Sequence, residues 1–207
     1  MANRSIDFFD AQFRRQIAAR DFALNPFEEA ALPHVSGRVL DLACGLGNLS
    51  IAAARKGCEV VAVDASPAAI EHLSSVAREE KLHLTAVNAD VEHWKEQGAF
   101  DTVVAIGILM FFPRGAALAL LDRVRRAVLP GGCAIVTVLI EGTTFMEPFD
   151  GDRHYLFAPD ELERAFPGWS ILSSRQGDLS GPGNATVKRF SSVIASKPRV
   201  VSTACAP

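Results

Sequence analysis

The chain has 207 residues, of which 49% are hydrophobic and 22% are charged, and its formal net charge is −3. This length suits one domain with a full hydrophobic core, and the composition excludes a disordered chain. The slight acidic balance leaves no basic excess to neutralise phosphates, so we expect no nucleic-acid partner.

Signals for membrane insertion, secretion and metal binding are missing from the sequence. The longest apolar runs have the size of strands, well short of the ~20 residues that cross a bilayer. The first residues contain no apolar core of a secretory signal. Cys44, Cys58, Cys133 and Cys205 lie far apart, which disfavours a zinc site or a disulfide framework. We therefore expect a cytoplasmic protein without a metal or membrane partner, and the oligomeric state stays open.

The predicted elements alternate between strands and helices after an N-terminal helical segment. That segment spans residues 1–35, in which Phe8, Phe9 and Phe13 recur at roughly helical spacing and Pro26 begins a second short helix. The predicted strands are residues 38–43, 59–64, 82–88, 100–106, 133–140, 169–175 and 186–196. The predicted helices are residues 48–56, 66–79, 116–128 and 159–166.

This alternation is typical of a doubly wound, Rossmann-like α/β fold with a parallel sheet. The early strands are nearly continuous apolar runs, as expected when helices cover both faces. Only residues 176–185 separate the last two strands, so these two should pair as an antiparallel hairpin. We predict one domain over residues 36–196, with residues 1–35 packed on it as a candidate lid and a loose tail over residues 197–207.

The most informative motif is the turn after the first strand. Residues 39–48 form a buried strand that runs into a turn containing Gly45 and Gly47, and a helix of small residues follows. Glycines in such a turn let the backbone approach a nucleotide closely. Asp41 lies inside the strand, ahead of the glycines, and this placement favours S-adenosylmethionine over a dinucleotide.

Carboxylates also follow the next two strands. Asp64 ends the second strand and Asp90 follows the third, and ligands of open α/β sheets bind beyond these carboxyl ends. Asp64 can accept both ribose hydroxyls, Asp90 can accept from the adenine amino group, and Asp41 and the turn amides can face the methionine part. Apolar residues beside the acids can sandwich the adenine ring. The predicted cofactor-binding residues are Asp41, Ala43, Cys44, Gly45, Gly47, Asn48, Asp64, Ala65, Ser66, Asp90, Val91, Ile106 and Gly107.

These motifs give the chain a resemblance to a known family. The chain resembles the class I S-adenosylmethionine-dependent methyltransferases at residues 40–47, Asp64 and residues 88–90, 100–104 and 129–132. The resemblance covers residues 36–196. It implies a seven-stranded sheet with its last strand antiparallel, S-adenosylmethionine as cofactor and S-adenosylhomocysteine as product. The family turn usually has glycine where this chain has Ala43, and alanine suits that position unless it requires a positive φ.

A narrower resemblance lies in the second half of the chain. The chain resembles the tellurite-resistance (TehB-like) methyltransferases at residues 107–112, 157–162, 168–169, 177–179 and 188–190. This likeness implies methyl transfer to a small molecule, such as a thiol or a chalcogen oxyanion like tellurite. That family tends to carry a His-Arg pair, linked to its active site, where this chain has Ser180-Gly181. The departure weakens the implication of tellurite.

The acceptor side of the site is less defined by the sequence. Methyl transfer needs alignment and desolvation, and it needs a general base only for a nucleophile that is protonated at neutral pH. We predict that residues 141–157 form the substrate wall and that His154 is the catalytic candidate, as a base or an anion contact, with Glu147 as an alternative. The fourth strand ends in residues 107–110, without the Asn/Asp-Pro-Pro-aromatic motif of nucleic-acid amino-methylating enzymes, so a small-molecule acceptor is expected.

Two other functions stay open at this point. Residues 45–50 nearly fit the G-x-G-x-x-G motif of an NAD-dependent oxidoreductase, but Ser50 replaces the third small residue and Asp41 would have no role. A non-catalytic protein that binds S-adenosylmethionine or S-adenosylhomocysteine would carry the same cofactor motifs. A poor acceptor pocket beside an intact cofactor site would favour this second alternative.

Overall fold

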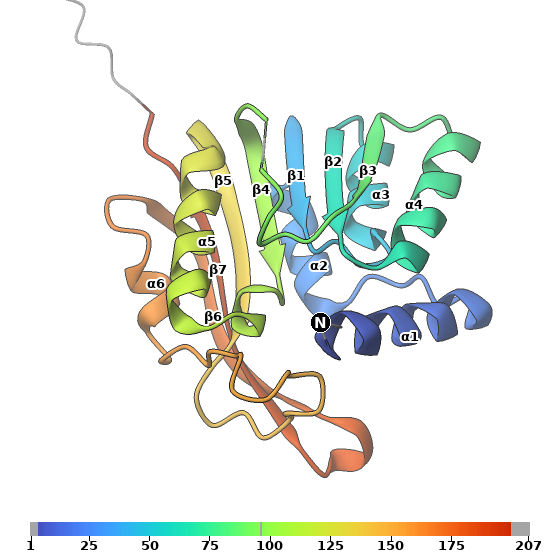
Figure 1. The fold of residues 1–207 in the computed structure, drawn as a ribbon. Helices are drawn as coiled ribbons and strands as arrows, with labels where there is room; N and C mark the ends of the chain where they lie inside the picture. Colours follow the sequence, from blue (N-terminus) through green and yellow to red (C-terminus); the bar gives the residue numbers. More distant parts are fainter. Residues whose placement is uncertain (1–3, 96, 200–207) are drawn as a thin grey trace, which may run out of the picture.

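The computed structural model describes residues 4–95 and 97–199, which contain one seven-stranded sheet in the order β3-β2-β1-β4-β5-β7-β6 (Figure 1). The strands are β1 (Arg38–Leu42), β2 (Glu59–Asp64), β3 (Leu84–Asn88), β4 (Phe100–Ile106), β5 (Val128–Leu139), β6 (Ser170–Ser180) and β7 (Val187–Ser196). The pairs among β1 to β5 are parallel, whereas β7 is antiparallel to both β5 and β6. The predicted α/β sheet with an antiparallel last strand is therefore confirmed.

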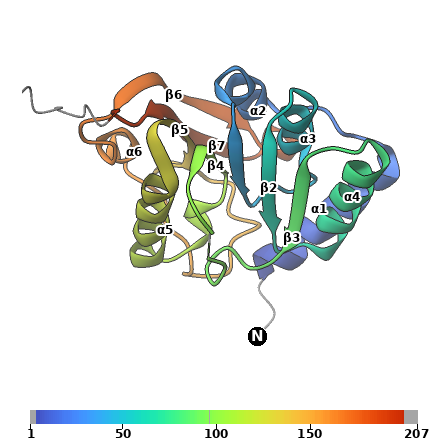
Figure 2. The same ribbon diagram turned by 90° about the horizontal axis from the view of Figure 1, so that it is seen from above.

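Helices cover both faces of the sheet (Figure 2). They are α1 (Arg4–Ala19), α2 (Pro26–Ala31), α3 (Asn48–Arg55), α4 (Pro67–Glu79), α5 (Arg114–Ala127) and α6 (Glu161–Arg164), with short 3₁₀ helices η1 (Leu32–His34), η2 (Leu109–Phe111) and η3 (Pro182–Asn184). One hydrophobic cluster joins the sheet to α2, α3 and α4, and a second joins it to α5 and α6. Because both faces are packed, the central strands carry nearly continuous apolar sequence.

Two of the predicted boundaries that differ from the structure have a clear physical reason. The Pro-Gly-Gly sequence expected to precede the fifth strand lies inside β5, because Gly131 and Gly132 exchange backbone hydrogen bonds of 2.9 and 2.8 Å with Lys197. Strand β6 extends to Ser180 rather than to residue 175, because the polar sequence there pairs residue by residue with β7.

Lys197, the first residue of the predicted loose tail, is hydrogen-bonded to the rest of the chain. The Lys197 ammonium donates to the carbonyl oxygens of Arg125 and Val128, at 2.9 and 2.7 Å, and so ties the chain to the end of α5. Residues 200–207, the rest of that prediction, lie outside the described residues.

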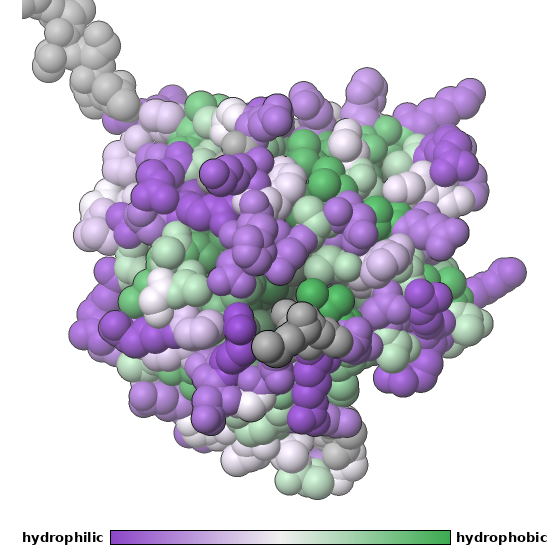
Figure 3. Space-filling model, viewed as in Figure 1, coloured by the Kyte–Doolittle hydropathy of each residue, from purple (hydrophilic) through white to green (hydrophobic). Residues whose placement is uncertain are grey.

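Helix α1 lies across the carboxyl-terminal edge of the parallel strands and packs against α4 (Figure 1). The loop after β5 and the turn between β6 and β7 extend from the same edge. Polar side chains cover most of the face seen in this view, and apolar surface shows in scattered patches (Figure 3). In the described part of the chain, no helix combines the length and the hydrophobicity needed to cross a membrane.

Candidate functional site

A cavity of about 440 Å³ lies at the carboxyl-terminal edge of the sheet, between the strands and α1. Every predicted cofactor residue except Gly47 lines it: Asp41, Ala43, Cys44, Gly45, Asn48, Asp64, Ala65, Ser66, Asp90, Val91, Ile106 and Gly107. Parallel pairing brings these residues together, since β1, β2 and β4 end at the same edge. Residues far apart in the sequence thus share one cavity.

Asp64 ties the glycine-rich turn to the end of β2. One carboxylate oxygen accepts the Gly45 amide and the other accepts the Ser66 amide, each at 2.8 Å. The two oxygens offer about four acceptor sites in total, so the carboxylate can still accept from a ligand. Burial raises the pKa of Asp64, while the amides of Ser66 and Gly45 oppose the shift by stabilising the anion.

The turn adopts left-handed backbone conformations at three positions. Gly45 and Gly47 have φ of 55° and 72°, and Ala43 has φ of 56°. The left-handed region is unfavourable for alanine because its Cβ approaches the following carbonyl oxygen. Gly47 caps α3, and a Cβ atom there would come within 2.6 Å of Leu73 in α4. A glycine at position 47 therefore lets the start of α3 lie close to α4, and its predicted contact with the cofactor stays a prediction.

Asp41 is a buried carboxyl group with one side-chain partner. It is 5% exposed, and the Ser50 hydroxyl donates to it over 2.6 Å. Burial raises the pKa of Asp41 to about 7; the Ser50 hydrogen bond lowers it, and the nearby acids Glu28 and Asp64 raise it further. Burial also raises the pKa of the Cys44 thiol well above its usual value, so Cys44 is no thiolate nucleophile at neutral pH.

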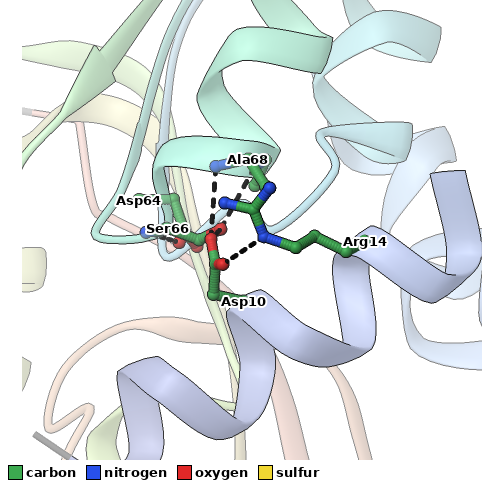
Figure 4. Close-up of polar contacts among 6 residues, drawn as sticks. Asp10, Arg14, Asp64, Ser66 and Ala68 are labelled. Carbon is green, nitrogen blue, oxygen red and sulfur yellow. Dashed lines mark hydrogen bonds and ion pairs between the residues drawn. The ribbon is translucent and has the colours of Figure 1, made fainter.

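Helix α1 is fastened to the cofactor side of the cavity through Asp10 (Figure 4). The Asp10 carboxylate accepts from the Ser66 hydroxyl at 2.6 Å and from the Ala68 amide at 3.2 Å, and Arg14 binds its other oxygen at 2.8 Å. These contacts place a negative charge at the first turn of α4, where the helix dipole favours it. The Ser66 hydrogen bond is the main reason that the pKa of Asp10 is lowered.

Aromatic residues of α1 complete this side. Phe8, Phe9 and Phe13 line the cavity, and a Cβ atom on Gly45 would lie 2.9 Å from the Phe13 ring. The Phe9 and Phe111 rings meet edge to face, with centroids 5.4 Å apart. The aromatic spacing in the sequence therefore corresponds to the face of α1 that covers the site.

The carboxylate after β3 is more open. Asp90 lines the cavity, and its oxygens approach the Glu92 amide at 2.9 Å and the His93 ring nitrogen at 3.4 Å. Ligand atoms of Asp90, Glu92 and His93 lie within 4.8 Å of one another. Exposed acidic groups of this kind are common without an ion, and the sequence predicts no metal here.

The predicted catalytic residue His154 does not line the cavity. Its ring lies 5.0 Å from that of Phe149, and its Nδ1 atom is 2.8 Å from the Gly151 carbonyl oxygen. Of the predicted substrate wall, only Phe145 and Pro148 reach the cavity, and Glu147 is exposed. A catalytic role for His154 stays a prediction that no contact in this structure supports.

Four residues line the cavity although the sequence analysis assigns them no role in the site. Phe27 from α2, Leu179 from β6, and Lys188 and Phe190 from β7 line the cavity with Phe145. The available signal was alternation, because residues 188 and 190 share one face of a strand. Alternation alone does not identify which face lines the cavity, because the partner strand and its register depend on the three-dimensional fold.

The comparisons with known proteins agree with this geometry. A family model described as a methyltransferase domain matches residues 39–132. A hemagglutinin of Eikenella corrodens is 24% identical over 166 residues, covering 78% of this chain and 55% of that protein. The probable S-adenosyl-L-methionine-dependent methyltransferase TehB of Haemophilus influenzae is 24% identical over 165 residues, covering 77% of this chain and 57% of TehB.

Solved structures show the same fold. The crystal structure of TehB from H. influenzae superposes with a TM-score of 0.74 at 20% identity, covering 88% of this chain and 65% of that one. The N-methyltransferase NodS from Bradyrhizobium japonicum, solved with S-adenosyl-L-homocysteine, gives a TM-score of 0.68 at 16% identity, covering 92% and 99%. The chain spans little more than half the length of the E. corrodens hemagglutinin and of TehB. The chain is therefore similar to a methyltransferase domain over residues 39–132, and its fold is that of the TehB and NodS structures.

Proposed function

We propose that the chain binds S-adenosylmethionine in the cavity above β1, β2 and β4 and transfers its methyl group to a small molecule. The observation that carries this proposal is the convergence of Asp41, Asp64 and Asp90 with the glycine-rich turn on one cavity. In this arrangement Asp64 takes the ribose hydroxyls, Asp90 takes the adenine amino group, and Asp41 and the turn face the methionine part.

The reaction needs little chemistry from the protein. The nucleophile of the acceptor forms a bond to the methyl carbon while the bond from carbon to the sulfonium sulfur breaks, and that electron pair stays on sulfur to give S-adenosylhomocysteine. A neutral nucleophile then loses its proton to solvent. Alignment and exclusion of water supply most of the catalysis, and they lower the activation barrier by on the order of 7–11 kcal/mol when the geometry is good.

Calorimetry tests the cofactor. We expect binding heat with S-adenosylmethionine and S-adenosylhomocysteine and none with NAD. Heat with NAD alone would reverse the assignment and restore the oxidoreductase alternative. Turnover is then measured as release of S-adenosylhomocysteine across thiols, tellurite, selenite, and small amines and carboxylates.

A non-catalytic binding protein is the second candidate. It would need no space beyond the cofactor, but the cavity continues past the predicted cofactor residues to Phe27, Phe145 and Phe190. This continuation favours an enzyme with an acceptor. Tellurite is less favoured as that acceptor, because Ser180-Gly181 stands where the TehB-like family tends to carry a His-Arg pair.

We further infer that α1 acts as a lid over the bound cofactor. Its Phe13 ring lies against the glycine-rich turn, and Asp10 binds the start of α4. A ligand of the size of S-adenosylmethionine would enter this cavity when α1 moves away from that turn, and the lid would then exclude water during transfer.

A further inference from the structure

We propose that the methyl acceptor is an organic anion with an apolar body of aromatic size, and that Lys188 binds its charged group. This inference rests on the proposed function and names the acceptor class for the same cavity. It assigns Lys188 as a specificity-determining residue, while the reacting atom of the acceptor faces the cofactor.

Strand register places Lys188 in the cavity wall. In the β6–β7 pair, Leu179 lies opposite Lys188 and Gly177 lies opposite Phe190. Alternate residues of a strand share one face, so Lys188, Phe190 and Leu179 belong to the face that lines the cavity. Gly177 leaves room for the Phe190 ring, because a Cβ atom there would lie 3.0 Å from it.

The loop after β5 holds a second aromatic ring against this lysine. Thr144 exchanges hydrogen bonds with the backbone of Val187, and the Thr143 hydroxyl bonds the amide and carbonyl groups of Arg189 at 3.0 Å. These bonds fix Phe145 so that the Lys188 ammonium lies 4.1 Å from the centre of its ring. The ammonium is thereby positioned before any ligand arrives.

The charge of Lys188 is uncompensated within the described part of the chain. Glu28, Asp41, Asp64 and Asp90 also line the cavity, and Lys188 is the basic residue among the described lining residues. No described carboxylate lies within ion-pair distance of its ammonium group. The surrounding residues also exclude water from the ammonium group, and this burial lowers the pKa of Lys188. A half-buried cation without a counter-ion is a site for an anion.

The neighbouring residues indicate that the anion is organic. Phe27 meets Phe190 edge to face with centroids 4.8 Å apart, and Phe145 and Leu179 add further apolar surface. A small inorganic oxyanion would place hydrated oxygens against these rings and gain a single cationic partner. An aryl or alkyl carboxylate instead buries its body on the rings and presents its charge to Lys188.

Arg189 provides a matched control on the same strand. It points to the opposite face of β7, where it binds Asp178 through hydrogen bonds of 2.9 and 3.0 Å. Replacing either residue with glutamine removes one positive charge from β7. Only the replacement of Lys188 removes a charge from the cavity.

The test compares charged and neutral probes of the same shape. Benzoate, cinnamate and 2-naphthoate, each with its carboxamide, are titrated into the full chain saturated with S-adenosylhomocysteine, with selenite and tellurite as inorganic probes. We expect at least one acid to bind about tenfold or more tighter than its amide, within the range for charge-assisted hydrogen bonds. In Lys188→Gln this preference should fall to about onefold, whereas Arg189→Gln should retain it.

Several results would overturn the inference. They are equal binding of every acid and its amide, an unchanged preference in Lys188→Gln, and tighter binding of tellurite than of all organic acids. If Lys188→Gln instead weakens S-adenosylhomocysteine itself, the lysine belongs to the cofactor carboxylate. Failure of the proposed function is separate, because it appears as an absence of cofactor heat in the wild-type chain, and the probe pairs are then measured on the free protein.

Discussion

Asp64 supports the turn and faces the cavity, and its replacement tests the cofactor site at the scale of one residue. We expect Asp64→Ala to weaken S-adenosylhomocysteine binding by roughly 1.5–3 kcal/mol, the range for hydrogen bonds to a charged group, or about 10- to 150-fold in Kd. Calorimetry measures the change. Glu59→Ala, at the exposed start of the same strand, is the control and should leave Kd unaltered. An unaltered Kd in a folded Asp64→Ala protein would remove Asp64 from the site.

Ala43 adopts a backbone conformation that glycine adopts without penalty. Its φ of 56° lies in the left-handed region, where a side chain costs about 1–2 kcal/mol. Because glycine loses more entropy on folding, we expect Ala43→Gly to raise the free energy of unfolding by about 0.5–1 kcal/mol. Urea denaturation checks this, with Ala62→Gly in β2 as a control that should be destabilised. Equal loss of stability in both variants would show that the left-handed position carries no strain.

Motif order predicted which residues converge on one cavity, because the acids lie within, at the end of, or after neighbouring parallel strands that share one edge. The part of the cavity wall that carries Lys188 depends on contacts between distant segments. Lys188 meets Phe145 only because the loop after β5 hydrogen-bonds to β7, and no local pattern encodes that pairing. His154 illustrates the limit, since its chemistry fitted the prediction but its position lies outside the cavity lining.

At the scale of elements, Asp10 supplies a polar attachment of α1 to the start of α4, beside the aromatic contacts of the same helix. We expect Asp10→Ala to speed dissociation of S-adenosylhomocysteine severalfold and to increase hydrogen exchange across α1, because three contacts to Asp10 are lost. Stopped-flow fluorescence and hydrogen exchange measure the two effects. Asp7→Ala, exposed on the same helix, is the control. Unchanged dissociation with increased exchange would mean that α1 moves without gating the cavity.

The ends of elements show why local pattern gives only approximate bounds. Helix α5 begins at Arg114, two residues before its predicted start, after a Pro113 that makes no side-chain cap. Residues 176–180, which include glycine and aspartate, have low strand propensity, yet they pair with β7 throughout. Tertiary pairing overrides local propensity in such cases. Strongly apolar strands such as β2 and β4 match their predicted bounds.

Stability of the whole molecule should depend on the charge of Asp41. Its pKa is about 7 in the folded protein against an ordinary value of 3.8, so between these values the folded state holds a proton that the unfolded state has lost. The contribution of this group is therefore fully present below about pH 4 and is lost as pH rises through 7. We expect Asp41→Asn to become more stable than wild type across this window, by up to about 4 kcal/mol.

Urea denaturation of the cofactor-free protein at pH 4, 6 and 8 measures this difference. Asp101→Asn is the comparison variant. The Asp101 carboxylate is only partly buried and accepts a hydrogen bond from the Arg38 amide at 2.8 Å. Parallel pH profiles for wild type and Asp41→Asn would show that Asp41 is ionised in the folded protein at neutral pH.

The position of β7 has a consequence for the order in which the molecule is made. This strand is the last in the described part of the chain, yet it lies inside the sheet, between β5 and β6. During synthesis the parallel strands β1 to β5 emerge first, and β6 has no neighbour until β7 follows it. The nascent chain can therefore assemble the part of the cavity at the ends of β1, β2 and β4 before β7, which carries Lys188 and Phe190, has been synthesised. Insertion of β7 between β5 and β6 completes this sheet, so the cavity wall with Lys188 and Phe190 forms after the part of the cavity above β1, β2 and β4.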